Sequence, residues 1–382
     1  MALYERPLSF KFDFGPGPCA EGYVKVDPGT RYAPELGYGF ETNARVYGKY
    51  RTDDLEGHSG AADSLKHSFC IPLGASFVVD VPDGTYRVKL LAGDALAETV
   101  TNVKAGEGRQ MLPPVHAAAG QWIEAMFSVV VRGAGRLRLT FAGPAPRINA
   151  LEIWPANGTL TVFLAGDSTV TDQPESGYPY CGWGQMLPAF FKHDVAVDNH
   201  ARSGQSSLSF VKEGLLDSIM ERIKPGDFLF LQFGHNDEKP DAARRTEPFS
   251  TFQGQLKLYL EAVRSKQATP VLVTPVHRRY FKEDGTLQDT HGDYITAIRE
   301  LAAQEAVPLI DLAERSRRLF EQAGVEGTKD DFMWVLPGEF IHFPAGVEDN
   351  THFQERGARR LAAQVAEAIR ELQLQPLQMF LR

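Results

Sequence analysis

Apolar residues in the first part of the chain, up to about residue 154, recur with a period of two. The runs 77–81 and 86–90 each place an apolar residue at every second position, and Asp83-Gly84 between them is typical of a tight turn. This pattern predicts a β-hairpin. The run 137–141 alternates in the same way after turn residues at 133 and 135. Many short strands separated by turns predict an all-β sandwich of about 150 residues.

After the segment Trp154-Pro155-Ala156-Asn157-Gly158, the pattern changes to short apolar runs that alternate with amphipathic stretches. Apolar runs typical of parallel strands buried on both faces occupy 160–165, 195–199, 227–233, 270–274 and 307–312. Apolar residues at helical spacing occupy 208–223, 252–263 and 361–372. We therefore expect a β-sandwich domain over 1–157 and, over 158–382, an α/β domain with a doubly wound parallel sheet. In such a sheet, ligands bind beyond the carboxyl ends of the strands.

Length and charge narrow the classes of function. At roughly 150 residues per domain, a chain of 382 residues fits two domains. Its 40 Lys and Arg against 49 Asp and Glu give a net charge of −9, and the chain lacks a basic run, so we do not expect a nucleic-acid partner. The composition leaves the oligomeric state open.

The first seven residues lack the basic region and apolar stretch of a secretory leader. No apolar segment approaches the roughly 20 residues that cross a bilayer. We expect a cytoplasmic protein without a membrane partner, although a secreted chain whose leader had been removed would have the same pattern. Cys19, Cys70 and Cys181 are too few and too scattered for a disulfide framework or a metal clip, so we expect free, buried thiols.

Polar groups that can catalyse a reaction follow three of the predicted strands. Ser168 comes directly after the run 160–165, although a serine taken alone at such a place is more often a turn or N-cap residue. Gly204, after the second strand, can bring a bare backbone N–H close to a bound oxygen. Asn236, after the third strand, points a side-chain amide at the same edge. Two such donors beside a serine are typical of an oxyanion hole.

A carboxylate and an imidazole stand near the carboxyl terminus. Thr351 and Gln354 fit a capping box for the last helix, so we expect Asp349 just outside this helix and His352 in its first turn. Three residues apart across a helix start, the two side chains can meet, as the orientation of a general base requires.

These blocks, in this order, resemble the SGNH (GDSL-type) hydrolases, and the resemblance implies that the doubly wound sheet is flavodoxin-like. The segments 182–185, 199–201, 232–237 and 349–353 are similar to those of rhamnogalacturonan acetylesterases, and the resemblance covers roughly residues 159–372. Gln205 departs from the pattern, because many relatives carry arginine after the glycine pair; how the substrate is gripped beside Gly204 is therefore open. The segment from Phe12-Asp13-Phe14-Gly15 to 148–153 resembles the galactose-binding-like β-sandwiches attached to such esterases.

The resemblance implies a mechanism. Ser168 is the expected nucleophile, His352 the general base and Asp349 the residue that orients the imidazole. The backbone N–H groups of Ser168 and Gly204 and the amide of Asn236 form the expected oxyanion hole. The expected activity is removal of O-acetyl groups from plant cell-wall oligosaccharides, above all rhamnogalacturonan fragments, through an acetyl-enzyme. An acetylated oligosaccharide is then the partner, and no metal or cofactor is expected.

Further residues are candidates for sugar binding. Trp183 and Tyr178 can offer a flat face to a pyranose ring, although either can equally fill a core. His235 is either a substrate contact or a structural histidine. Arg278, with Arg279, follows the fourth strand and is either a bidentate fork for galacturonate carboxylates or part of a solvated pair.

Two other functions stay open. One is a broader SGNH esterase that acts on acetylxylan, microbial glycans or lipid esters. The other is a non-catalytic carbohydrate-binding protein, against which the complete set of Ser168, Asn236, Asp349 and His352 argues. Neither an aromatic patch nor a calcium-type acidic cluster stands out in residues 8–154, so a sugar-binding role of the sandwich is open as well.

Overall fold

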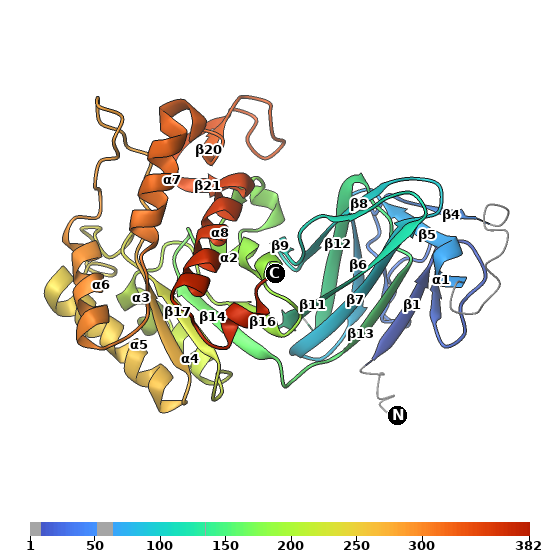
Figure 1. Cartoon of the computed structure of the whole chain (residues 1–382), viewed down its shortest axis with the longest axis horizontal. Coiled ribbons are helices and arrows are strands. Elements are labelled where there is room, and N and C mark those ends of the chain that lie inside the picture. Colours follow the sequence, from blue (N-terminus) through green and yellow to red (C-terminus); the bar gives the residue numbers. More distant parts are fainter. Residues whose placement is uncertain (1–8, 52–63, 134) are drawn as a thin grey trace. The chain divides into compact units, whose positions relative to one another are not determined.

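The computed structural model of the chain describes residues 9–51, 64–133 and 135–382. The residues on which the expectation about a leader depends, 1–7, lie outside these ranges. The chain forms two compact units: residues up to 159 together with 191–196, and residues 160–190 together with 197–382. Strands dominate the first unit, whereas the second contains strands and helices (Figure 1). No helix in the described ranges is long and apolar enough to cross a membrane.

Two mainly antiparallel sheets build the first unit. One has the strand order β11 (Gln121–Val131), β7 (Gly84–Asp94), β13 (Ala150–Pro155), β1 (Phe10–Phe14), β2 (Val24–Val26). The other has the order β10 (Val115–Ala117), β8 (Thr99–Ala105), β12 (Arg136–Ala145), β6 (Ala75–Asp80), β3 (Tyr38–Phe40), with β9 (Arg109–Gln110) beside β8. Two further strands, β4 (Val46–Tyr50) and β5 (Ser68–Pro72), pair with each other in a separate sheet. The short helix α1 (Ser64–His67) lies between them in the chain.

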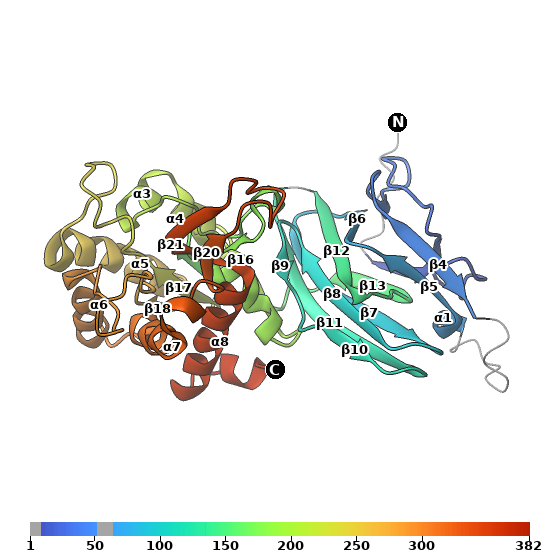
Figure 2. The same cartoon turned by 90° about the horizontal axis from the view of Figure 1, so that it is seen from above.

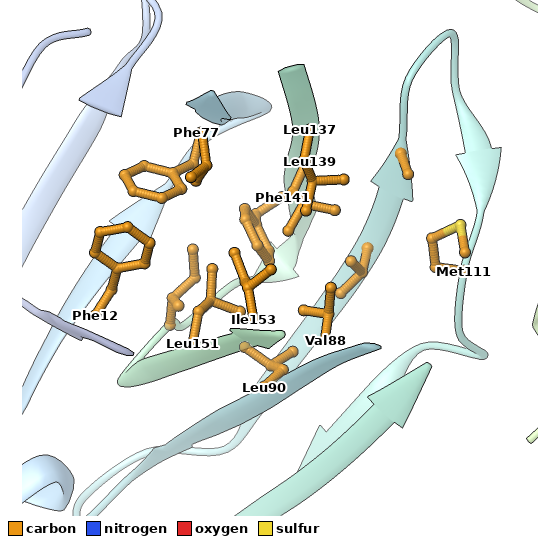
Figure 3. Packing of buried hydrophobic residues seen from close by; sticks show 14 of the residues in the cluster. Phe12, Phe77, Val88, Leu90, Met111, Leu137, Leu139, Phe141, Leu151 and Ile153 are labelled. Atoms are coloured by element: carbon orange, nitrogen blue, oxygen red, sulfur yellow. The ribbon is translucent and has the colours of Figure 1, made fainter. Parts of the chain in front are cut away.

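Alternate residues of both sheets form a single core. The register pairs Leu139 with Phe77 in one sheet and Ile153 with Val88 in the other. All four side chains are buried in the same cluster, and Figure 3 shows them in the space between the strands. The prediction of an all-β sandwich is confirmed, because a period of two buries one side of each strand and leaves the other polar.

The predicted hairpin over 77–90 is wrong. Strand β6 pairs with β3 and β12, whereas β7 pairs with β11 and β13. The turn at Asp83-Gly84 therefore carries the chain from one sheet to the other. A hairpin and a crossing between sheets bury the same alternate residues, so only pairing with distant strands distinguishes them.

The second unit contains a five-stranded sheet. Its order is β16 (Val195–Asn199), β14 (Leu160–Gly166), β17 (Phe228–Gln232), β18 (Thr269–Val273), β19 (Leu309–Ile310). The pairings from β14 through β19 are parallel. In chain order this is 2-1-3-4-5, the flavodoxin-like arrangement, and the predicted fold class is confirmed. The strand order reverses beside β14, which places the expected ligand crevice at the carboxyl end of that strand.

Helices pack on the sheet in two groups. One group contributes buried side chains to a cluster with β14, β17 and β18 and consists of α3 (Ser207–Lys212), α4 (Leu215–Met220), α5 (Gln253–Ser265), α6 (Asp293–Gln304). The other group consists of α2 (Trp183–Met186), α7 (Leu312–Gly327) and α8 (Glu355–Glu371), and α8 packs on both α2 and α7. Phe163 lies in the first cluster, whereas the next residue, Leu164, approaches Gly184 of α2. Successive strand residues therefore face different helices. Figure 2 shows the helices of this unit around its strands.

The remaining elements are short. Single turns occur at η2 (Glu175–Gly177), η3 (Leu187–Phe190), η4 (Pro248–Phe252), η5 (Leu377–Phe380). A small sheet has the order β15 (Tyr180–Cys181), β21 (Val347–Gln354), β20 (Phe332–Val335). The predicted helix over 208–223 is two helices, because Gly214 between them has a φ of 71°. Cys70 and Cys181 are buried free thiols as predicted, but Cys19 is exposed.

Candidate active site

Asp349 and His352 lie on strand β21, not at a helix start. Helix α8 begins at Glu355, and its N-cap residue is Gln354, which makes no side-chain cap. The predicted capping box with Thr351 is therefore wrong. Residues 347–349, 353 and 354 pair with other strands instead, and this pairing, not the local capping signal, decides where the helix begins.

A bulge in β21 brings the two side chains together. Phe332 of β20 opposes Phe353, but the next residue, Met333, opposes Asp349. Residues 350–352 therefore leave the ladder. Along a regular strand, residues three apart point to opposite faces of the sheet. The bulge removes this restriction.

The carboxylate of Asp349 holds the bulge closed. Its Oδ1 accepts the backbone N–H groups of Thr351 and His352 at 2.7 and 3.1 Å, and its Oδ2 lies 2.6 Å from Nδ1 of His352. Burial raises the pKa of Asp349, but the hydrogen bonds and the imidazole outweigh it and lower the pKa to about 2. An ionised Asp349 keeps the proton of the neutral imidazole on Nδ1, which leaves Nε2 as an acceptor.

The serine that follows β14 faces this acceptor. Oγ of Ser168 lies 2.9 Å from Nε2 of His352, although the two residues are 184 positions apart in the chain. Asp167 braces the turn, because its Oδ1 accepts both the N–H and the hydroxyl of Thr169 at 2.9 and 2.8 Å. The structure thus places hydroxyl, imidazole and carboxylate in one line of hydrogen bonds, the arrangement that lets a serine lose its proton.

The loop with Gly204 lies beside the serine. Nε2 of Gln173 donates to the carbonyl oxygen of Ser168 at 2.9 Å and to Oγ of Ser203 at 3.3 Å. Gly204 has a φ of 83°, a conformation that a residue with a Cβ rarely adopts. The bridge through Gln173 therefore holds the loops after β14 and β16 together at the carboxyl edge of the sheet.

Asn236 reaches the same loop from β17. Its Nδ2 donates to the carbonyl oxygen of Gln205 at 3.0 Å. The neighbouring Asp237 accepts the backbone N–H of Gly234 at 3.1 Å and that of Ser207 at 3.1 Å. Burial raises the pKa of Asp237 to about 6. These contacts bring Ser168, Gly204 and Asn236 into one site.

Tyr180 is a residue of this site that the sequence analysis missed. Its ring lies edge-on to that of His352, with the centroids 4.9 Å apart. Burial raises the pKa of Tyr180 above its usual range, and hydrogen bonding to Ser168 and Ser203 opposes the rise without cancelling it. A strand of two residues that pairs far along the chain leaves no periodic signal, so the pattern of residues could not indicate this contact.

Arg279 and Trp334 hold the bulge through hydrogen bonds to Asn350, which lies between Asp349 and His352. The N–H of Arg279 donates to the carbonyl oxygen of Asn350 at 2.7 Å, and Oδ1 of Asn350 accepts from Nη1 of Arg279 at 3.2 Å and from Nε1 of Trp334 at 2.9 Å. The guanidinium lies 4.5 Å from the indole centroid. Because Arg279 is buried, it supports the loop between Asp349 and His352 and does not form a fork at the rim.

The structure changes the candidates for sugar binding. Trp183 is 1% exposed and donates from Nε1 to Gln232 at 2.8 Å, so the prediction that it is a sugar platform is wrong. Tyr178 is 45% exposed and stays a prediction. Arg278 forms an ion pair with Glu238 and has a side chain only 13% exposed. An internal ion pair thus replaces both the carboxylate fork and the solvated pair expected for Arg278.

His235 has the position of a structural histidine. It is 3% exposed, its Nδ1 lies 3.3 Å from Oδ2 of Asp167, and its ring packs edge-on to His291 with centroids 4.6 Å apart. Burial lowers the pKa of His235 to about 4. The structure therefore places this imidazole behind the turn of the serine, not on a surface that a sugar could contact.

His277, in the same histidine cluster, makes stability depend on pH. Burial and the neighbouring His291 lower its pKa from 6.5 to about 4. Between pH 6.5 and about pH 4, the unfolded chain binds a proton at His277 that the folded chain does not. The free energy of unfolding therefore decreases as the pH is lowered through this range, by as much as ~3 kcal/mol. We expect urea unfolding midpoints to decrease from pH 7 to pH 5, and less so for His277→Gln. Equal pH slopes for parent and variant would contradict this; His116→Gln, at an exposed position, is the control.

Metal ligation has no candidate in the ranges that the structure describes, because they contain no group of three or more His, Cys, Asp or Glu side chains placed to hold an ion.

The side chain of Gln205, which departs from the family pattern, is buried and accepts a hydrogen bond from Ser209 at 2.6 Å. It therefore points toward helix α3, which gives it a structural contact in place of a substrate contact.

Two families match parts of the chain. Residues 164–360 match the GDSL-like lipase/acylhydrolase family, and residues 10–112 match the galactose-binding-like domain of β-agarase and YXIM-esterase-like proteins. The first range contains Ser168, Gly204, Asn236, Asp349 and His352. The second lies entirely in the β-sandwich.

Similar proteins come from Bacillus subtilis (strain 168). Rhamnogalacturonan acetylesterase RhgT is 49% identical over 215 residues, 56% of this chain and 91% of RhgT. The uncharacterized esterase YxiM is 32% identical over 349 residues, 88% of this chain and 87% of YxiM. The crystal structure of YxiM superimposes with a TM-score of 0.52 at 28% identity and covers 96% of this chain and 99% of that one. The similarity to YxiM thus extends over both units.

Proposed function

The chain belongs to the GDSL-like lipase/acylhydrolase family, and from this premise we propose that it is a serine carbohydrate esterase that removes O-acetyl groups from rhamnogalacturonan fragments. The substrate class rests on the rhamnogalacturonan acetylesterases among its relatives, two of them 49% and 41% identical. The acetylated oligosaccharide is the only partner that the proposal requires.

One observation carries the catalytic part of the proposal. Oγ of Ser168 lies 2.9 Å from Nε2 of His352, whose Nδ1 lies 2.6 Å from Asp349. This geometry gives the hydroxyl a base and gives the base a fixed tautomer. A carbohydrate-binding protein without catalysis would not need this line of hydrogen bonds, and that alternative is therefore disfavoured.

In the first half of the reaction, Oγ of Ser168 forms a bond to the acetyl carbonyl carbon while its proton passes to Nε2 of His352. The oxygen of the tetrahedral intermediate becomes negative and accepts hydrogen bonds from the backbone N–H of Ser168 and Gly204 and from Nδ2 of Asn236. Collapse breaks the bond to the sugar oxygen, which takes the proton from His352. The products are a free sugar hydroxyl and acetyl-Ser168.

In the second half, His352 accepts a proton from water as the water oxygen attacks the acetyl carbon. The same three donors bind the second oxyanion. Collapse returns the proton to Oγ of Ser168 and releases acetate. Because His352 performs each proton transfer, the scheme is complete without a metal or cofactor.

Acetate release from a panel of esters tests the proposal. The panel contains acetylated rhamnogalacturonan oligosaccharides, acetylated xylan oligosaccharides, and p-nitrophenyl esters with acetyl and longer acyl chains. We expect the highest kcat/KM on the pectic substrates and a fall with each added methylene, because a pocket shaped for acetyl rejects longer chains. A flat profile would favour the broader esterase, and no acetate release at all would favour the binding protein.

Asn236 is expected to contribute to the rate and not to the fold. Asn236→Ala removes one donor to the oxyanion, and such a loss typically lowers kcat by ~10²–10³. Steady-state kinetics with p-nitrophenyl acetate measure the effect, with the unfolding midpoint as the check on the fold. A variant within threefold of the parent would refute the role. Asn157→Ala, in the segment between β13 and β14, is the matched control.

A further inference from the structure

A cavity beside the small sheet has no role in the reaction scheme. Its volume is about 480 Å³, within the range of sites for small ligands. Its walls include Tyr178, Phe340, Gln354 and three arginines near the start of α8: Arg356, Arg359 and Arg360.

One residue of the cavity lining, Gln354, lies on the same strand as the general base. Gln354 is two residues beyond His352 on β21, and it pairs directly with Tyr180 of β15. Residues paired across two strands point to the same face of a sheet, and the ring of Tyr180 lies against His352. Tyr178 is two residues before Tyr180. The Tyr178 wall of the cavity is therefore a short step along the chain from the residue that contacts His352.

Aromatic side chains form one wall. The rings of Tyr178 and Phe340 meet edge-on with centroids 5.7 Å apart. Tyr178 nevertheless remains 45% exposed, although a large apolar ring gains free energy from burial. A sugar ring has one face formed by C–H groups, and such a face can cover an exposed aromatic side chain.

Arginines form another part of the lining. The lining contains three arginines and one acid, Glu355, in a chain whose net charge is −9. The cavity also lies at the amino end of α8, a helix of 17 residues whose dipole is positive there. The carboxylates of Asp330, Asp331 and Glu355 pair with these arginines, so an anionic ligand would compete with them, and the helix dipole favours a negative group at this end of the cavity.

The three arginines differ in how firmly they are held. Arg360 pairs with the buried carboxylate of Asp331, and Arg356 pairs with Asp330 and Asp331. Arg359 is 42% exposed and donates to Glu355 at 3.0 Å, four positions away on the same helix. Such exposed pairs contribute little free energy. Arg359 can therefore exchange its partner for a ligand carboxylate at small cost.

We propose that this cavity binds a uronate residue of the substrate, with its carboxylate on Arg359 and its ring on Tyr178, while the acetylated sugar lies at Ser168. The inference rests on the proposed function and extends it by assigning a subsite. Rhamnogalacturonan carries a carboxylate on each galacturonate residue, and the planar guanidinium of arginine suits a carboxylate bidentately.

Paired substrates test the inference. One is an acetylated rhamnogalacturonan oligosaccharide; the other is the same oligosaccharide with its carboxyl groups reduced to alcohols. We expect the parent to have a KM about tenfold lower for the acidic form, as one hydrogen-bonded charge pair can provide. Arg359→Gln should raise KM for the acidic form about tenfold and leave kcat, the reduced form and p-nitrophenyl acetate within twofold. Tyr178→Ala should raise KM for both oligosaccharides but not for p-nitrophenyl acetate.

Arg318→Gln is the matched control, because Arg318 also forms an exposed pair with a glutamate four positions away on a helix. It should change none of these constants. Equal KM values of the parent for the two oligosaccharides, or an equal effect of Arg359→Gln on both, would overturn the subsite and leave the esterase intact. If the parent released acetate from neither oligosaccharide, the proposed function would fail and the subsite with it.

Discussion

Replacing Ser168 with alanine is expected to lower kcat for acetyl ester hydrolysis by ~10⁶, the loss found when a serine triad loses its nucleophile. Without Oγ no acetyl-enzyme forms, and only the oxyanion donors and substrate binding remain. Initial rates with p-nitrophenyl acetate measure the loss. The carbonyl oxygen of Ser168, which accepts from Gln173 at 2.9 Å, is unaffected, so the unfolding midpoint should change little.

A second measurement identifies the covalent step. Rapid acid quenching of the parent with substrate should trap an acetyl group on the peptide that contains Ser168, and the variant should show none. Ser218→Ala, on helix α4, is the control, because Ser218 is exposed and its hydroxyl bonds only within its own helix. Activity of Ser168→Ala within tenfold of the parent would contradict the proposed nucleophile.

Asp349→Asn is expected to lower kcat by ~10⁴, as the loss of the orienting carboxylate does in serine triads. The amide can still accept the N–H groups of Thr351 and His352, which bond to Oδ1 of Asp349 in the parent. Its NH₂ then faces Nδ1 of His352, which must become the acceptor. The proton moves to Nε2, and the imidazole can no longer accept the proton of Ser168.

The pH dependence separates this tautomer effect from a loss of structure. The pKa of Asp349 is lowered to about 2, so its titration lies below the range in which the parent is assayed, and kcat should fall for Asp349→Asn across that whole range. Asp241→Asn, which removes a surface carboxylate paired with Arg244, should leave kcat unchanged. A loss below tenfold for Asp349→Asn, with an unaltered unfolding midpoint, would contradict the role of the carboxylate.

Local residue types predicted the candidate catalytic groups but not the way in which they meet. Ser168, Asn236 and Gly204 follow buried runs, and parallel strands bring their carboxyl ends to one edge, so the sequence sufficed for their convergence. Asp349 and His352 were placed by a capping pattern of Thr351 and Gln354 that the structure does not use. The bulge that joins them depends on pairing of β21 with β20 and β15, which involves residues that no local window contains.

The sequence also did not determine which of the aromatic and basic candidates for sugar binding are exposed to solvent. Trp183 and Tyr178 are five positions apart and equally suited to a sugar by residue type, yet α2 buries Trp183 whereas Tyr178 stays exposed. Arg278 and Arg279 are both taken up by internal partners, Glu238 and Asn350. Arg359 attracts no notice in the sequence, because a charged residue on an amphipathic helix usually faces solvent.

The sequence by itself determined the two classes of architecture, and its resemblance to the SGNH hydrolases implied the flavodoxin-like sheet of the second unit and the set of groups that the reaction needs. Period, turn residues and strand ends are local properties, and each is set by the side chains within a few positions. Only the tertiary structure decided which strands pair, that β6 and β7 lie in different sheets, how the bulge aims His352 at Ser168, and which arginines remain available. Each of these depends on contacts between residues far apart in the chain, which stabilise the fold only when they have formed.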